Sequence, residues 1–146
     1  MWIAFALMAA VLWGISYVLY ERLVKDIAPA SIMLFTIIGA FFFYVSLTMA
    51  SGSLIRDFNI IKNSGQSIKL IISIVAVNAM ANLLGLYSMK AKSATAMGMI
   101  EISYPLFTAL FAYLLFKQNQ LSSGLLLGGL LIMSGVICII YFDKPI

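Results

Sequence analysis

Residues 94–116 read ATAMGMIEISYPLFTALFAYLLF, and this stretch decides the fold. It holds one charged side chain, Glu101, and one proline, Pro105, in a run that is otherwise uncharged and mostly apolar. A helix needs about 20 mostly apolar residues to cross the hydrocarbon core of a bilayer. The stretch is long enough, so it predicts a transmembrane helix that carries an acid and a helix-disrupting residue inside the membrane.

The composition of the whole chain agrees with this prediction. Of the 146 residues, 64% are hydrophobic and 10% are charged, whereas soluble domains have about 45–50% apolar and about 25% charged residues. These values exclude a soluble domain, a disordered chain and a nucleic-acid-binding module. The chain has no histidine and one cysteine, Cys138, so we expect no internal disulfide, no metal site and no cofactor.

Five segments predict membrane-spanning helices, and we expect an all-α polytopic membrane protein with a single transmembrane domain. The segments cover about residues 2–20, 31–50, 70–89, 94–116 and 122–142. The last three are joined by short connections, as in antiparallel helical bundles. The longer connection, 51–69, has apolar side chains on one helical face, at Leu54, Ile55, Phe58 and Ile61. This pattern indicates either a short helix in the membrane interface or a plain loop.

The positive charges show little preference for one orientation. Lysine and arginine residues near the ends of the spans set which way a membrane protein inserts. Five spans place four of them on the side of the N-terminus, at Arg56, Lys62, Lys69 and Lys117. The other side has five, at Arg22, Lys25, Lys90, Lys92 and Lys144. This near balance favours dual topology, in which copies insert both ways up, over one orientation set by charges near the first helix.

Three stretches resemble the EamA-type domain of the drug/metabolite transporter superfamily. Residues 6–29 contain the matching Trp-Gly pair, tyrosine, basic residue and proline, at Trp13, Gly14, Tyr17, Lys25 and Pro29. Residues 85–116 match a small-residue turn and an apolar helix with the central Pro105. Residues 128–136, GGLLIMSGV, fit the glycine pattern on the subunit-joining helix of the related small multidrug resistance proteins. One departure is FKQNQLS after residue 115, where family members often have an acid and this chain has Gln118 and Asn119.

The resemblance implies a half-size transporter with one five-helix repeat. Family members commonly have ten helices in two inverted repeats, and such repeats place the substrate site near the membrane midplane. One repeat could be completed to ten helices by an inverted second copy of the chain or by a separate partner half. Small residues allow close helix contact, so the predicted dimer interface is on the last helix, at Gly124, Gly128, Leu131, Ile132 and Gly135. The alternative for these residues is packing within one subunit.

Polar side chains inside the spans are the candidate functional residues, because they are costly in a bilayer. Glu101 is the only acid well inside a span, and Pro105 leaves the carbonyl of Glu101 without its usual helical donor. Burial disfavours the charged form of a carboxyl, so Glu101 could exchange a proton or bind a cation; alternatively, it reaches the interface or is held neutral by Asn82. The predicted substrate- and proton-binding residues are Glu101, Trp13, Tyr17, Asn78, Asn82, Tyr104 and Pro105.

Purely structural roles for these residues remain as alternatives. Asn78 and Asn82 are four residues apart, which favours hydrogen bonds to a neighbouring helix over contact with a substrate. Trp13 and Tyr17 could form the wall of a cavity and contact a cation through their rings, but core packing is the favoured single explanation for each of them. The expected equal depth of Trp13, Asn82 and Glu101 depends on helix rotations that the sequence does not specify.

The function that we expect is transport of a small organic molecule by alternating access, with no enzymatic activity. The substrate would be an amphipathic cation or an amino-acid-like metabolite, and the coupling ion would be a proton bound at Glu101. The predicted partners are the lipid bilayer and either a second copy or a second half-transporter, in a prokaryotic cytoplasmic membrane. The alternatives are an accessory half-subunit and a subunit of a lipid-linked sugar translocase, each acting with a different chain.

Overall fold

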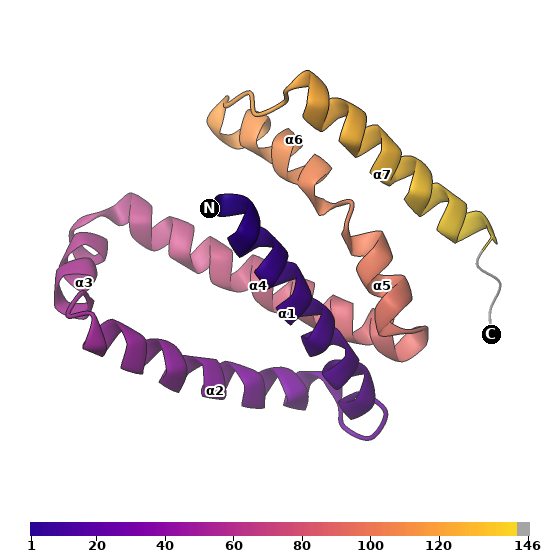
Figure 1. The fold of residues 1–146 in the computed structure, drawn as a ribbon. Coiled ribbons are helices and arrows are strands. Elements are labelled where there is room, and N and C mark those ends of the chain that lie inside the picture. Colours follow the sequence, from indigo (N-terminus) through magenta and orange to yellow (C-terminus); the bar gives the residue numbers. More distant parts are fainter. Residues whose placement is uncertain (143–146) are drawn as a thin grey trace. The chain divides into compact units, whose positions relative to one another are not determined.

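The computed structural model describes residues 1–142, and the helical bounds follow the hydropathy of the sequence. The helices are α1 (Trp2–Leu23), α2 (Pro29–Ala50), α3 (Leu54–Asn63), α4 (Gly65–Ala91), α5 (Ala94–Glu101), α6 (Tyr104–Phe116) and α7 (Ser123–Phe142). Figure 1 shows their order, and the described residues contain no strand. Lys144, one of the five positive charges expected on the side opposite the N-terminus, lies outside the described residues.

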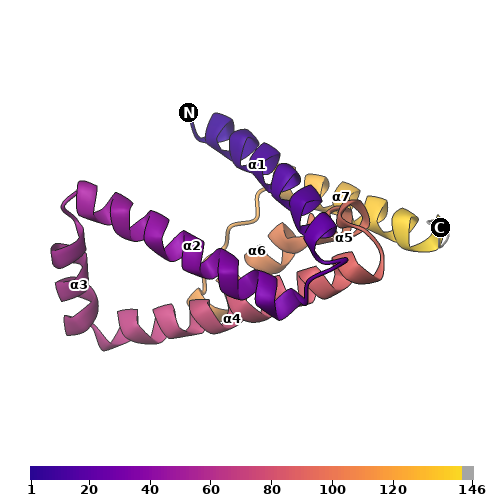
Figure 2. The same cartoon turned by 90° about the horizontal axis from the view of Figure 1, so that it is seen from below.

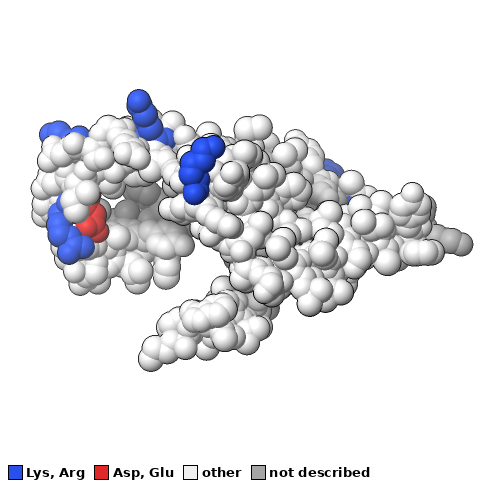
Figure 3. Space-filling model, turned by 90° about the horizontal axis from the view of Figure 1, so that it is seen from above, with Lys and Arg blue, Asp and Glu red and all other residues white. Residues whose placement is uncertain are grey.

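Five helical stretches are long and apolar enough to cross a membrane, which confirms the predicted all-α class and number of spans. They are Trp2–Leu23, Pro29–Ala50, Gly65–Ala91, Ala94–Phe116 and Ser123–Phe142. The largest difference from the sequence-based bounds is α4, which is longer at both ends than the predicted 70–89. Figure 3 shows few Lys, Arg, Asp or Glu side chains on the visible face, as expected for helices that contact lipid.

The residues of the chain form two compact units, Tyr20–Lys90 and a second unit made of Met1–Leu19 with Ala91 onward. In the first unit, α2 and α4 are joined at one end by α3, and their other ends approach each other (Figures 1 and 2). The buried side chains of this unit lie at those other ends: Val24, Pro29, Ile32, Leu86 and Met89. The long apolar surfaces that remain exposed are suited to lipid rather than water.

The connection between α2 and α4 is helical, so the short-helix prediction is correct and the plain loop is not. Gly52 has a φ of +66° in the turn that ends α2, a conformation that glycine adopts without steric cost. α3 then runs from Leu54 to Asn63 with Ile55 and Phe58 largely exposed. An amphipathic helix between two candidate spans is typical of a segment that lies in the membrane interface.

The predicted helix over 94–116 is interrupted in the structure. α5 ends at Glu101, Ile102 and Ser103 form a turn, and α6 begins at Tyr104. Pro105 is the physical cause, because it lacks the N–H that would bond to the carbonyl of Glu101 in a continuous helix. It is instead placed in the first turn of α6, where backbone N–H groups have no helical partner. The break lies directly beside the one acid of this span.

The second unit packs α7 against α5 and α6. Gly129 and Val136 are the buried residues of α7, and a Cβ atom added at Gly129 would lie 2.3 Å from Cδ2 of Leu106 on α6. A side chain at Gly129 would therefore displace the end of the Leu106 side chain, so glycine favours close approach of the two helices. Ser93 caps the start of α5, since its hydroxyl accepts a hydrogen bond from the backbone N–H of Ala96 at 3.1 Å. Figure 1 shows α6 and α7 as an antiparallel hairpin.

Candidate functional site

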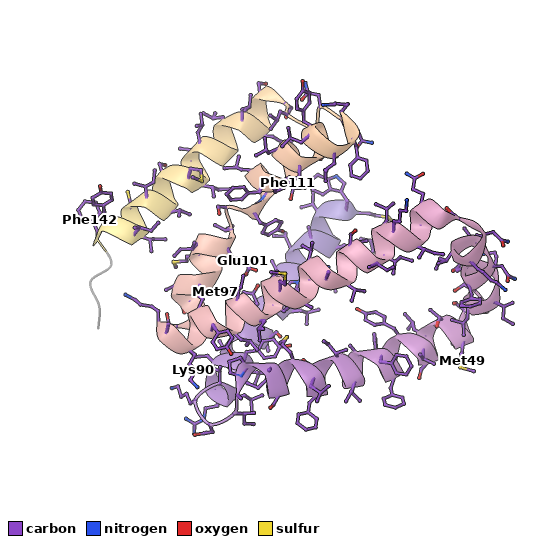
Figure 4. The ribbon with its side chains drawn as sticks, turned by 180° about the vertical axis from the view of Figure 1, so that it is seen from behind. Met49, Lys90, Met97, Glu101, Phe111 and Phe142 are labelled. Carbon is purple, nitrogen blue, oxygen red and sulfur yellow. The ribbon has the colours of Figure 1, made fainter. Side chains whose placement is uncertain are left out.

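Glu101 stands at the C-terminal end of α5, where the helix stops (Figure 4). It is the only Asp, Glu, Lys or Arg among Trp2–Leu19 of α1 and the whole of α5, α6 and α7. Its backbone carbonyl is one of the last four of α5, which have no partner in a regular helix. The turn after it is closed by hydrogen bonds from the N–H of Ile102 to Gly98 O at 3.1 Å and of Ser103 to Ile100 O at 3.2 Å.

The hydroxyl of Tyr17 donates a hydrogen bond to Oε2 of Glu101. Tyr17 comes from α1 and Glu101 from α5, 84 positions apart in the chain. The contact therefore joins α1 to the C-terminal end of α5. The contact joins two residues that the sequence predicted as functional, but their pairing was not predicted.

The ring of Tyr17 has contacts on two further sides. The Trp13 ring lies one helical turn away on α1, with 5.7 Å between the ring centroids. On the other side, a Cβ atom added at Gly98 would lie 3.4 Å from a ring carbon of Tyr17. This is an ordinary van der Waals distance, so the tyrosine ring lies against α5 at Gly98, with its hydroxyl at Glu101.

A pocket of about 260 Å³ lies between α1 and α5 beside this pair. Its lining is mostly apolar or small, with Tyr17 and Thr95 as the polar side chains; the residues are Gly14, Tyr17, Val18, Ala94, Thr95, Gly98, Met99 and Ile102. This volume is just below the usual range of small-molecule sites, about 300–1,000 Å³. Of the predicted site residues, only Tyr17 lines the pocket.

Sequence reasoning missed the glycines and Thr95 of this pocket. Gly14 was quoted only as part of a family pattern, and Gly98 was not singled out. A signal for them exists in the sequence, because Ala94, Thr95 and Gly98 are small residues at helical spacing on one face. Such a face permits a bulky side chain from another helix to approach closely.

Of the remaining predicted site residues, Tyr104 and Pro105 belong to the start of α6 after the break, and Asn78 and Asn82 lie on the other unit. Tyr104 follows the break and is 63% exposed, and Pro105 shapes the break itself. Asn78 and Asn82 are on α4 in the Tyr20–Lys90 unit. Their side-chain amides donate to carbonyls of the same helix, at Ile74 and Asn78, over 3.0 and 2.8 Å. The sequence favoured hydrogen bonds from these amides to a neighbouring helix, whereas the hydrogen bonds in the structure lie within α4. A role of Asn78 and Asn82 in substrate binding stays a prediction.

The predicted dimer residues on α7 lie mostly away from its packed face. Gly124, Leu131 and Gly135 are exposed, and Gly128 and Ile132 are half-buried at the edge of the packed face. Cβ atoms added at Gly128 or Gly135 would meet nothing within 4 Å. Packing of α7 within the chain thus uses Gly129 and Val136. The five predicted dimer residues are left largely uncovered.

Comparison with known proteins identifies one family. The EamA-like transporter family matches residues 1–141. The searches of curated proteins and of solved structures found no match. Together with the five apolar helices, the family match shows an integral membrane protein whose helices contact the lipid bilayer. Members of this family are transporters rather than enzymes.

Proposed function

Because this chain belongs to the EamA-like transporter family, we propose that it is a secondary transporter of small organic molecules in a prokaryotic cytoplasmic membrane. It works by alternating access, and the ion that it couples to transport is a proton. The observation that carries this proposal is the pair formed by Glu101 and Tyr17, next to a pocket of about 260 Å³.

Glu101 can couple proton and substrate because it is the sole Asp, Glu, Lys or Arg among Trp2–Leu19 of α1 and the whole of α5, α6 and α7. A carboxylate inside a membrane protein needs a compensating partner. The Tyr17 hydroxyl supplies one partner, and a proton or a cationic substrate can supply another. One carboxylate that binds either a proton or a cation produces antiport, since each must leave before the other binds. The substrate is then an amphipathic cation; an amino-acid-like metabolite is the second substrate class that the family suggests.

Two chains of opposite orientation form the transport unit. The near balance of positive charges, four on one side and five on the other, supports insertion both ways up. Trp13, Glu101 and Tyr104 are exposed in the single chain, which suits a cavity completed by a second copy. The uncovered stripe on α7, at Gly124, Gly128, Leu131, Ile132 and Gly135, would hold the two copies together through close helix contact.

The test is transport into liposomes by the full chain and by Glu101 variants. An imposed pH gradient should drive uptake or exchange of members of a panel of amphipathic cations, with proton movement followed by an internal pH dye. Glu101→Gln should abolish proton-driven transport, because the side-chain amide of glutamine does not bind or release a proton near neutral pH. Glu101→Asp is the matched control and should retain part of the activity. The dimer, measured by light scattering in detergent, should persist in both variants.

Two outcomes of the liposome experiment would contradict the proposal. Full proton-driven transport in Glu101→Gln would exclude Glu101 as the coupling group. Transport of cations by the unaltered chain without any proton movement would show facilitated movement instead of antiport.

A further inference from the structure

The short helix α3 has an exposed apolar stripe that ends at a lysine. Ile55, Phe58 and Lys62 are separated by three and four positions, so they lie on one side of the helix. Ile55 is 77% and Phe58 is 63% exposed, and Lys62 is exposed as well. The long stem of a lysine can lie along such a stripe while its ammonium group reaches a polar layer. The stripe therefore suits a boundary between hydrocarbon and charged groups.

Positive charge is in excess at this end of the Tyr20–Lys90 unit. Asp57 is half-buried and accepts a hydrogen bond at 3.0 Å from Nε of Arg56, with which it forms an ion pair. It is also the only acid within residues 27–100. The end of the unit around α3 thus carries the positive charges of Arg56, Lys62 and Lys69 against one negative charge.

The fold holds α3 at the depth of the lipid headgroups. It connects Pro29–Ala50 with Gly65–Ala91, which are both long and apolar enough to cross a membrane, and Figures 1 and 2 show it between their ends. The ends of membrane-spanning helices meet the polar headgroup region. In Figure 3, Lys and Arg side chains lie beside an acidic side chain at the left of the view, where α3 is found.

We infer that α3 binds the headgroups of anionic phospholipids through the side formed by Ile55, Phe58 and Lys62. The two apolar side chains enter the boundary of the acyl chains, and the ammonium group of Lys62 contacts the lipid phosphate. Interfacial helices bind membranes through burial of their apolar side together with attraction to anionic lipids. This partner surface is separate from the pair of Tyr17 and Glu101, so the inference does not rest on the proposed function.

The charge around α3 favours an anionic lipid over the other possible occupants. A zwitterionic headgroup brings a positive charge of its own, so it compensates the excess at α3 less well. A second copy of the chain that docked through the same surface would bring the same excess, and like charges would repel. A negatively charged headgroup is complementary both to Lys62 and to the exposed apolar side chains next to it.

The lipids around α3 can be identified locally in the full chain. Cys138, the single cysteine, is replaced by serine, and a bimane label is attached through Asn59→Cys at an exposed position of α3. The protein is placed in vesicles of equal parts phosphatidylcholine and phosphatidylglycerol with identical acyl chains, and one of the two lipids is brominated in those chains. Stronger quenching of the label by brominated phosphatidylglycerol than by brominated phosphatidylcholine is the expected result.

Variants of Lys62 test the role of its charge. Lys62→Gln should lower the preference for phosphatidylglycerol about fivefold, the contribution of one basic side chain near an anionic surface. Lys62→Arg keeps the charge and should keep the preference. Lys117→Gln is the matched control, because it removes the same charge from the connection between α6 and α7. It should leave the lipid composition at α3 unchanged.

Three results would overturn the inference. Equal quenching by the two brominated lipids in the unaltered chain would show no preference for an anionic headgroup. Equal losses of preference in Lys62→Gln and Lys117→Gln would show that the attraction follows the net charge of the chain. Weak quenching by both lipids would mean that protein, such as a second copy, covers α3. None of these measurements depends on transport, so each result is distinguishable from a failure of the proposed antiport.

Discussion

Tyr17 and Glu101 show how a single contact can define a site in a chain that is otherwise apolar. Glu101 accepts a hydrogen bond from an uncharged donor on another helix. Gly98 lies against the tyrosine ring, at a place where an added Cβ atom would be in ordinary van der Waals contact with it. At this scale, the proposed site depends on two side chains from different helices that meet at the end of α5.

Glycines on α7 provide a prediction at the same scale. Gly129→Val should destabilise the chain relative to Gly135→Val by about 1–3 kcal/mol, because the new side chain overlaps Leu106. Both variants make the same change in helix propensity, so the difference isolates packing. Unfolding in a detergent titration measures it. Equal stability of the two variants would show that α6 and α7 do not pack closely at Gly129.

At the scale of elements, the break between α5 and α6 is the feature with the greatest consequence. It places Glu101 at a helix terminus, where both its carboxylate and its backbone carbonyl lie outside a continuous helix. Pro105 in the first turn of α6 produces this arrangement at little cost, since proline is tolerated there. The element boundary and the candidate site therefore have the same cause.

Replacement of Pro105 should remove the break. In Pro105→Ala, the restored N–H can donate to the carbonyl of Glu101, and α5 and α6 should join into one helix. Amide hydrogen exchange measured by mass spectrometry should then slow over residues 101–106. Pro29→Ala is the control, because Pro29 is the first residue of α2 and its replacement joins no helices. Unchanged exchange over 101–106 would mean that the break does not depend on the proline.

The cap at the start of α5 is a second element-scale prediction. Ser93→Ala removes the hydroxyl that accepts from the N–H of Ala96 and should lower the free energy of unfolding by about 1 kcal/mol. Ser93→Asp keeps an acceptor at this position and should be close to the unaltered chain. A loss of equal size in both variants would contradict the capping role.

At the scale of the whole molecule, the distribution of positive charge leads to a prediction about topology. A cytoplasm-active reporter and a periplasm-active reporter, each fused in turn after Ile146, should both give signal if copies insert both ways up. Lysines at Gln118 and Asn119 would raise the positive charges on the N-terminal side from four to six, against five on the other side. The double variant should therefore favour one reporter.

A signal from only one reporter in the unaltered chain would contradict the antiparallel homodimer. The chain would then require a different partner, as an accessory half-subunit or as a subunit of a lipid-linked sugar translocase. The liposome assay separates these outcomes, because a homodimer transports alone and a half that needs a different partner does not.

The sequence was sufficient for the class, the number of spans and the identity of the central acid. The thickness of the bilayer and the cost of unpaired polar groups require long apolar helices, so composition and length reveal them. The same cost distinguishes Glu101 from every other residue of its span by residue type alone. The amphipathic pattern of 54–61 allowed a helix there but could not exclude a loop, because four apolar positions are too few to decide.

Only the tertiary structure decided which side chains meet. The spanning helices are apolar on all sides, so no stripe in the sequence specifies which face of α1 turns toward α5. The contacts of Tyr17 with Glu101 and of Gly129 with Leu106 follow from those rotations, as does the separation of the packed face of α7 from its stripe of small residues. Hydrophobicity determines that a helix enters the membrane, whereas the shapes of facing side chains determine how it is turned within the membrane.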